Sequence, residues 1–319
     1  MALQKIGASL ILLLAVSGLI APQRSTASQS PSTPKSRIGT LLGNFSSPMN
    51  NETSGIAVSR RNRKWDQDIF WVHNDSGDKA FLYAVTSDGD REAVIKIPGA
   101  TSVDWEDIAW GPGPDGKGDC LYIGDIGDND GRRDDCVVYR IREPKLRESL
   151  SLSSREDPLP LEGPVVARRF AYPDGPHDAE TLLVHPKTGI VYIVTKSRSG
   201  TSGVYKFPPE TADNSRKVVT LEKVAALTVP DEFTLIPRRI TGGSISPDGR
   251  RIAFCTYFSG YELKLPANAR DFDAIWKAPL LPFNLPPLRQ TEAITYTRDG
   301  KSVIVTSEGV NAPIYAVKR

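Results

Sequence analysis

Residues 243–257 read GSISPDGRRIAFCTY, and residues 292–307 read EAITYTRDGKSVIVTS. In both stretches a short apolar strand pattern is followed by an Asp-Gly turn and then by a second apolar run. This pattern predicts a β-hairpin, because Asp-Gly readily adopts the backbone conformation of a tight turn between antiparallel strands. Two hairpins with the same layout indicate a repeat, so the chain is expected to contain further copies.

The two-strand unit appears five times along the chain. Its first strands align on an Ile or Leu and are expected at residues 54–58, 106–110, 180–184, 243–246 and 292–296. Its apolar second strands are expected at 69–74, 121–125, 191–196, 252–257 and 303–307. Third strands that carry tyrosine are expected at 81–85, 138–141, 203–207, 261–265 and 313–317, and fourth strands at 92–97, 165–172 and 221–229.

The two ends of the chain complement each other. The chain ends after the third strand of the fifth copy, and residues 37–45 can supply the missing fourth strand, which leaves the ring without an open sheet edge. The predicted fold is all-β: a single five-bladed β-propeller over residues 37–319, closed by an N-terminal strand. The copies are unequally spaced, and two long intervals leave six blades, or another β fold, as alternatives.

The N-terminus has the layout of a secretory signal. Lys5 precedes an apolar run from Ile6 to Ile20, and small residues follow at 25–27. The run is short for a membrane span, so we expect residues 1–27 to be a cleaved signal peptide, with an uncleaved anchor as the alternative. Residues 28–36 form a Ser/Pro linker. The mature chain is expected in the periplasm or outside the cell.

The charge balance argues against two classes of partner. The chain has 40 basic and 38 acidic residues, and residues 1–27 contain two of the basic ones and no acidic one, so the mature chain has no formal net charge. We therefore expect no binding to nucleic acid and no membrane association after signal cleavage, and we expect a monomer. Cys120, Cys136 and Cys255 are expected to form no structural disulfide, since the first two lie at opposite ends of one hairpin.

Propeller geometry should bring one set of acidic residues together. The first strand of each blade runs beside the central axis, so the residues that begin these strands should meet at one mouth of the channel. They are Ser54, Glu106, Glu180, Gly243 and Glu292. Three carboxylates in a narrow channel repel one another, so they could share protons, pair with a cation such as Arg239, or bind a metal ion. Oxygen donors favour Ca²⁺. In the alternative interpretation the acidic residues only cap the inner strands in solvent.

The order Ser, Glu, Glu, small residue, Glu resembles that of calcium-activated nucleotidases (apyrases), which are five-bladed propellers with a central calcium ion. The resemblance implies Ser54, Glu106, Glu180 and Glu292 as metal ligands. Gly243 departs from the pattern, and Ser244 or Thr241 is a candidate to replace it. The sequence SPDGR followed by RIAF also resembles the repeats of periplasmic TolB-like propellers, which supports the fold rather than a function.

A second set of residues follows the second strand of each blade and should lie at the same mouth. We expect a ligand-binding face there, formed by Asn74, Asp75, Asp78, Asp125, Tyr257 and Glu308. Nearby, Asp128, Asp130 and Asp134 have the D-x-D-G-x-x-D spacing of many calcium loops, without the bidentate Glu of an EF-hand. They form a second candidate calcium site, although Asp/Gly-rich turns also arise for conformational reasons alone.

Three functions are compatible with these residues. The first is an exported module that binds a small-molecule or protein ligand at a calcium-bearing mouth. The second is a calcium-dependent phosphoester hydrolase of the apyrase or phytase kind, in which His177, Lys196 and Arg239 are the candidate catalytic residues. The third is a glycosidase that uses carboxylates of two blades. We favour the binding module, because a metal-binding pattern is visible and a catalytic constellation is not.

Overall fold

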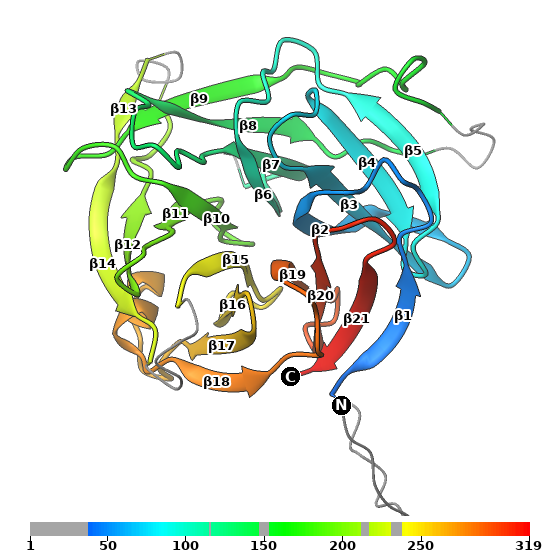
Figure 1. Cartoon of the computed structure of the whole chain (residues 1–319). Coiled ribbons are helices and arrows are strands. Elements are labelled where there is room, and N and C mark those ends of the chain that lie inside the picture. Colours follow the sequence, from blue (N-terminus) through cyan, green and yellow to red (C-terminus); the bar gives the residue numbers. More distant parts are fainter. Residues whose placement is uncertain (1–37, 115, 147–152, 212–216, 231–237) are drawn as a thin grey trace, which may run out of the picture. The chain divides into compact units, whose positions relative to one another are not determined.

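The computed structural model describes residues 38–114, 116–146, 153–211, 217–230 and 238–319. These residues form five sheets that surround a central axis as the blades of a β-propeller (Figure 1). The prediction of an all-β, five-bladed ring is confirmed, and the six-bladed alternative is wrong. The predicted signal peptide and linker lie outside the described residues. Within the described part, no helix is both long enough and apolar enough to cross a membrane.

Blades one and two follow the predicted order of strands from the axis outward. Blade one consists of β2 (Thr53–Lys64), β3 (Gln67–Asn74), β4 (Phe81–Thr86) and β5 (Arg91–Lys96). Blade two consists of β6 (Trp105–Pro112), β7 (Asp119–Asp125), β8 (Cys136–Arg142) and β9 (Val166–Ala171), and β13 (Val219–Thr220) adds to β9 in parallel. The sequence does not predict β13, because a two-residue strand has no periodicity of its own.

Blades three to five complete the ring. Blade three consists of β10 (Ala179–Val184), β11 (Val191–Thr195), β12 (Thr201–Lys206) and β14 (Glu222–Thr228). Blade four consists of β15 (Ile240–Ile245), β16 (Arg251–Thr256), β17 (Ser259–Lys264) and β18 (Leu281–Asn284), and the 3-10 helix η1 (Phe272–Lys277) precedes β18. Blade five consists of β19 (Thr291–Tyr296), β20 (Ser302–Ser307), β21 (Pro313–Lys318) and β1 (Thr40–Asn44). The edge strand β18 is missed from sequence because it is short and contains Pro282.

The two long intervals in the sequence contain connections rather than a sixth blade. After β8, part of the chain runs along the outer strand of blade one. Val94 donates its backbone N–H to Ser153 Oγ at 2.7 Å, and Leu159 donates its N–H to the Val94 carbonyl at 2.8 Å. The connection between β12 and β14 contains β13, which joins blade two. Extra length between the inner strands is therefore used to link neighbouring blades.

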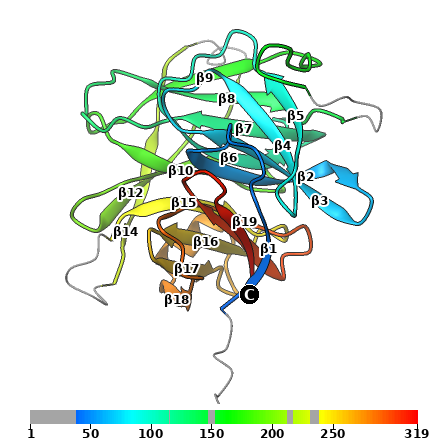
Figure 2. The same cartoon turned by 45° about the vertical axis from the view of Figure 1, so that its right-hand side comes forward.

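Strand β1 closes the ring as predicted. It pairs antiparallel with β21, with Thr40 opposite Ala316 and Asn44 opposite Pro313. The first described strand and the last one therefore share a sheet (Figure 2). The inner strand β19 of this blade also contacts β2 of blade one, so the five inner strands form a closed circle.

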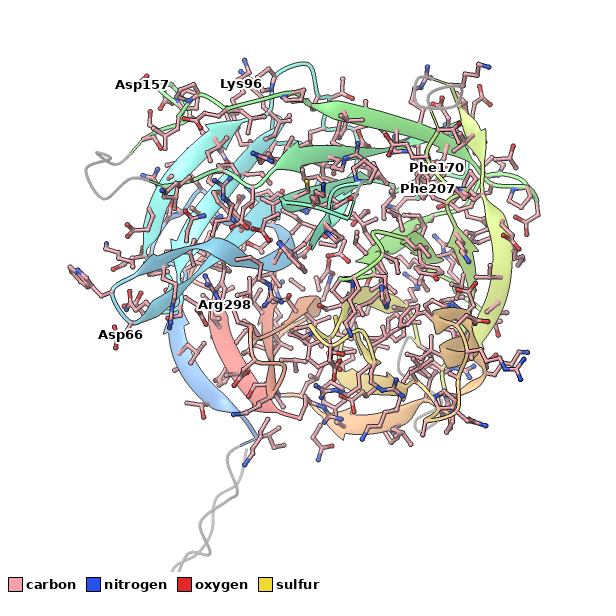
Figure 3. The ribbon with its side chains drawn as sticks, turned by 180° about the vertical axis from the view of Figure 1, so that it is seen from behind. Asp66, Lys96, Asp157, Phe170, Phe207 and Arg298 are labelled. Atoms are coloured by element: carbon pink, nitrogen blue, oxygen red, sulfur yellow. The ribbon has the colours of Figure 1, made fainter. Side chains whose placement is uncertain are left out.

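Apolar clusters fill the spaces between successive blades. Each of the five clusters draws residues from two neighbouring blades, as Trp71 of β3 and Ile123 of β7 do between blades one and two. Between blades two and three, the rings of Phe170 and Phe207 lie 5.1 Å apart at their centroids (Figure 3). Because burial of apolar area is the main stabilising contribution, these clusters fix the inner strands relative to one another.

Glu143 provides a polar link between blades one and two. It lies directly after β8, and its side chain is fully buried. Its carboxylate accepts hydrogen bonds from the Arg60 backbone N–H at 3.1 Å and from Trp71 Nε1 at 3.0 Å. Asn62 Nδ2 donates to the same group at 3.2 Å. All of these donors belong to blade one, so the carboxylate holds the irregular part of β2 against blade two.

Replacing Glu143 by Gln should lower the free energy of unfolding by about 2 kcal/mol, because the new amide NH₂ would face the buried N–H of Arg60 and the remaining neutral oxygen accepts more weakly than a carboxylate. Chemical denaturation of the variant measures this loss. The matched control is Glu156→Gln, at an exposed position, which should change stability by less than about 0.5 kcal/mol. Equal stability of the two variants would contradict the role assigned to Glu143.

Candidate metal centre

Each inner strand begins with the same irregularity. In all five blades the pairing between the first and second strands shifts by one residue near the start of the inner strand. Such a β-bulge leaves one residue outside the ladder and redirects its side chain. We call these five residues the bulge ring: Ser54, Glu106, Glu180, Thr241 and Glu292. The register thus corrects the alignment of blade four, in which Thr241 rather than Gly243 is the equivalent residue.

Two members of the bulge ring connect adjacent blades through their hydroxyl groups. Ser54 Oγ donates to the carbonyl of Glu106 at 2.7 Å and lies 3.2 Å from its Oε2. Thr241 Oγ1 donates to the carbonyl of Thr291 at 2.8 Å. These two hydrogen bonds therefore connect blade one to blade two and blade four to blade five.

A second set of side chains lies beside the bulge ring. These residues directly follow the second strand of each blade, and they are Asp75, Ile126, Lys196, Tyr257 and Glu308. Backbone hydrogen bonds fasten them to the segment that leads into the inner strand, as from Asp75 N to Glu52 O at 2.9 Å and from Lys196 N to Asp178 O at 2.9 Å. The approach to the inner strand and the exit from the second strand therefore meet at one mouth of the channel.

Three carboxylates converge at this mouth. One carboxylate oxygen each of Asp75, Asp104 and Glu106 lies within 4.8 Å of the other two. Asp125 positions one member of this triad, because its Oδ1 accepts the backbone N–H of Asp104 at 3.1 Å. Gly127 makes room for the group: a Cβ at this position would lie 2.4 Å from both Asp104 Oδ2 and Glu106 Oε1. Only glycine fits there without displacing the two carboxylates.

Each of the three carboxyl groups of the triad has a raised pKa. Burial, together with the charges of Asp75 and Asp104, raises the pKa of Glu106 well above its usual value. Burial and the negative charges of Asp75 and Asp178 raise the pKa of Asp104 to about 6. Burial raises the pKa of Asp75 as well. The shifts show that ionising all three groups in the protein is unfavourable unless a cation joins them.

Arg133 pairs with Asp125 at 2.8 Å near the mouth, and Lys196 is the cation that contacts the bulge ring. Its Nζ forms an ion pair with Glu180 Oε1, and its charge also favours ionisation of Asp75, Glu106 and Glu292. The other oxygen, Glu180 Oε2, is buried and has no hydrogen-bond partner among the described residues. One ammonium group therefore offsets only part of the negative charge and leaves a buried acceptor open.

Blade five adds two further carboxyl groups. Burial, reinforced by the charge of Glu308, raises the pKa of Glu292 to about 8. Gln290 Nε2 donates a hydrogen bond to Glu292 Oε1. Glu292 is thus held next to another acid at the rim of the same mouth.

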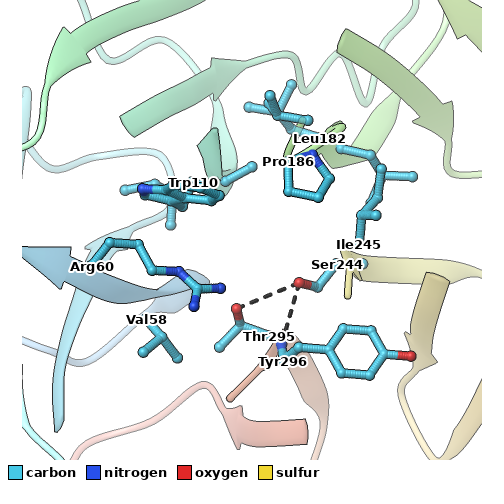
Figure 4. Close-up of a pocket in the computed structure, with 14 residues that line it drawn as sticks. Val58, Arg60, Trp110, Leu182, Pro186, Ser244, Ile245, Thr295 and Tyr296 are labelled. Atoms are coloured by element: carbon cyan, nitrogen blue, oxygen red, sulfur yellow. Dashed lines mark hydrogen bonds between the residues drawn. The ribbon is translucent and has the colours of Figure 1, made fainter. Parts of the chain in front are cut away.

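The floor of the channel contains a carboxylate in a different environment. Asp107 is fully buried, and it accepts backbone N–H groups from Ile108 at 2.8 Å and from Leu182 of the next blade at 2.9 Å. Beyond it, the far end of the channel leaves about 20 Å³ between residues such as Trp110 and Tyr296 (Figure 4). That space is roughly enough for one water molecule.

Two predicted members of the ligand-binding face are engaged inside blade one. Asn74 Nδ2 donates to the Met49 carbonyl at 2.6 Å and to Asp78 Oδ2 at 2.9 Å. Asp78 Oδ2 also accepts from Arg155 Nη2 at 2.8 Å. These side chains satisfy one another, whereas Asp75 and Glu308 face the mouth.

The second candidate calcium loop forms a turn. Asp128 accepts the backbone N–H groups of Arg132 and Arg133, each at 2.9 Å, so both of its oxygens are engaged. Asp130 pairs at 3.6 Å with Arg132, and Asp134 is exposed. In the described parts of the chain, the one group of three metal-type ligand atoms within 4.8 Å is the triad, and it includes none of these residues.

The structure separates the three candidate catalytic residues into two locations. His177 and Lys196 line one pocket on blade three. His177 Nε2 lies 2.9 Å from Asp174 Oδ1 and 2.9 Å from the hydroxyl of Tyr205. Arg239 is half-buried directly before β15, in blade four.

Sequence reasoning missed Asp104, a member of the triad, and Asp178, whose charge contributes to the raised pKa of Glu106. Each stands two positions before a glutamate of the bulge ring, so Asp104-Trp105-Glu106 and Asp178-Ala179-Glu180 repeat an Asp-x-Glu pattern. The repeated pattern was the available signal. No family model matches the chain, and no curated protein matches it in sequence.

The raised pKa of Glu292 predicts a pH-dependent stability. In the metal-free folded protein this group keeps its proton up to about pH 8, whereas in the unfolded chain it loses the proton near pH 4.3. The free energy of unfolding should therefore fall as the pH rises from about 5 to 8, and Glu292→Gln should reduce that fall. Thermal melting of both proteins in chelator across this range measures the slopes, and identical slopes would contradict the assignment.

Proposed function

We propose that this protein is an exported binding module that holds Ca²⁺ at the acidic mouth of the channel and uses the ion to bind a ligand. The observation that carries the proposal is the convergence of Asp75, Asp104 and Glu106 within 4.8 Å. Glu106 is only 2% exposed, so it is held in place rather than free to turn into solvent. A buried carboxylate among other carboxylates is stable only with a compensating positive charge or as the protonated acid, and a bound cation supplies the charge.

The donor set fits a hard divalent cation. All three groups offer carboxylate oxygens, and Ca²⁺ prefers six to eight oxygen ligands. The unpartnered Glu180 Oε2 is a further buried acceptor at the same mouth. The resemblance of the bulge ring to calcium-bearing propellers points to the same ion.

The arrangement also leaves room for a ligand on the ion. Asp75 and Asp104 are half-buried, so the triad is accessible from solvent on their side while Glu106 closes the other side. One oxygen from each of the three carboxylates leaves the coordination shell of Ca²⁺ incomplete, and the remaining positions can be taken by oxygens of a small molecule or of a protein loop. This supports a binding role without requiring a catalytic group.

Thermal melting in excess calcium and in chelator tests the proposal. At about 100 times the dissociation constant, binding to the folded state should add about 2.7 kcal/mol, or about 5 °C in Tm for a chain of this size. Asp104→Asn and Glu106→Gln should each abolish most of the shift, because each removes a charged ligand. Neither substitution changes side-chain size, so loss of packing is minimised.

The matched control is Asp130→Asn, which removes an exposed carboxylate of the turn after β7 and should keep the full calcium shift. If calcium raises the Tm of the wild type and of both triad variants equally, the ion binds elsewhere. If calcium has no effect on the wild type, the proposed function is wrong.

A further inference from the structure

A pocket of about 290 Å³ lies on blade three, directly beside the acidic mouth. It shares Lys196 and Asp178 with the mouth, and His177, Arg198 and Lys223 also line it. The charge of Asp178 acts on both Asp104 and Glu106, so the pocket and the triad are electrostatic neighbours.

The lining of this blade-three pocket is basic and rich in hydrogen-bond donors. Lys196, Arg198 and Lys223 carry permanent positive charge, and Asp178 is the one acidic residue among the described residues that line it. Arg198 is exposed, and the side chain of Lys223 is 47% exposed while its Nζ contacts Asp174 at 2.7 Å. Arg198 is therefore the cation most open to solvent, whereas Lys196 and Lys223 line the pocket while they pair with Glu180 and Asp174.

Hydrogen bonds orient the inner wall of the pocket. Asp174 accepts from Lys223 Nζ and from the Tyr205 hydroxyl, at 2.7 and 3.0 Å. The same hydroxyl lies 2.9 Å from His177 Nε2. The wall is therefore pre-organised, which lowers the entropy cost of holding an anion. Thr201 and Ser197 add hydroxyl groups to the same lining.

Charge makes occupation of the pocket depend on the metal. Without a divalent cation the triad adds no positive charge to that of Lys196, which is paired with Glu180, and any ionised carboxylate of the triad repels an anion. With Ca²⁺ on the triad, the mouth gains two positive charges next to a pocket that already contains cations, so an oxyanion in the pocket is attracted more strongly.

We propose that the blade-three pocket binds an oxyanion group of the ligand, such as a phosphoryl, sulfuryl or carboxylate group, and that it does so only after the cation has bound. This inference rests on the proposed function and narrows the ligand to anionic molecules. Arg198 and Lys223 supply charged hydrogen bonds to the oxyanion, and Lys196 lines the pocket while it pairs with Glu180 of the bulge ring.

Calorimetric titration of the purified chain with sodium sulfate and, separately, with sodium acetate tests the inference. Each anion is titrated into calcium-saturated protein and into metal-free protein. Binding is expected only with calcium, and Arg198→Gln or Lys223→Gln should weaken it about tenfold or more, because each removes a charged donor. Preference for sulfate would indicate a tetrahedral group in the natural ligand, and preference for acetate a carboxylate. The matched control is Lys301→Gln, an exposed lysine in the β19–β20 turn, which should leave anion affinity unchanged.

The outcomes separate the two proposals. Calcium binding without binding of either anion overturns the anion pocket and leaves the metal site intact. Anion binding that is unaffected by Arg198→Gln and Lys223→Gln, or that is as strong without calcium, also overturns it. If the wild-type chain does not bind calcium at all, the proposed function is wrong.

Discussion

The β-bulge that recurs at the start of every inner strand is the feature on which the candidate site depends. Successive side chains of a regular strand point to opposite faces of the sheet. Without the bulge, each residue of the bulge ring would follow this alternation in its own strand. One extra residue per blade instead turns a polar side chain toward the axis at the same height in all five sheets. The interblade apolar clusters then hold the five bulges close together, so a local irregularity of each strand becomes a shared site.

Two buried carboxylates of blade two show how environment separates a structural acid from a candidate ligand. Asp107 receives backbone N–H groups from its own strand and from blade three, which stabilise its charge and tie inner strands together. Glu106, one residue earlier, faces Asp75 and Asp104 instead. Burial raises the pKa of both groups well above the usual value, but backbone N–H groups oppose the shift at Asp107, whereas the charges of Asp75 and Asp104 add to it at Glu106. The distinction supports placing the metal on the triad and not deeper in the channel.

Much of the fold could be predicted from sequence because its signals are local. The Asp-Gly turns at Gly249 and Gly300 have positive φ as such turns require, and the alternation of each strand fixes which face is buried. The bulge ring was also found in four blades, since Ile56, Ile108, Leu182 and Ile294 stand at the same distance from it. Blade four broke this rule, because the register of β15 is set by its pairing with β16 and not by the position of Ile245.

The composition of the mouth was less predictable, because it depends on loops from different blades. The sequence favoured Glu180 and Glu292 as partners of Glu106, but folding brings Asp75 and Asp104 closer to it. It also suggested Arg239 as a compensating cation, where the structure places Lys196. Pairwise distances between loop residues of separate repeats are not encoded in any one repeat, so only the three-dimensional arrangement reveals them.

The proposed function requires that carboxylates of blades one and two hold one divalent cation. A crystal structure of the protein grown with calcium, with an anomalous difference map recorded at long wavelength, would locate the ion. We expect one peak bonded to Asp75, Asp104 and Glu106, with calcium–oxygen distances of about 2.3–2.6 Å. A map without a peak at the mouth, or with Lys196 Nζ occupying the space among the three carboxylates, would contradict it.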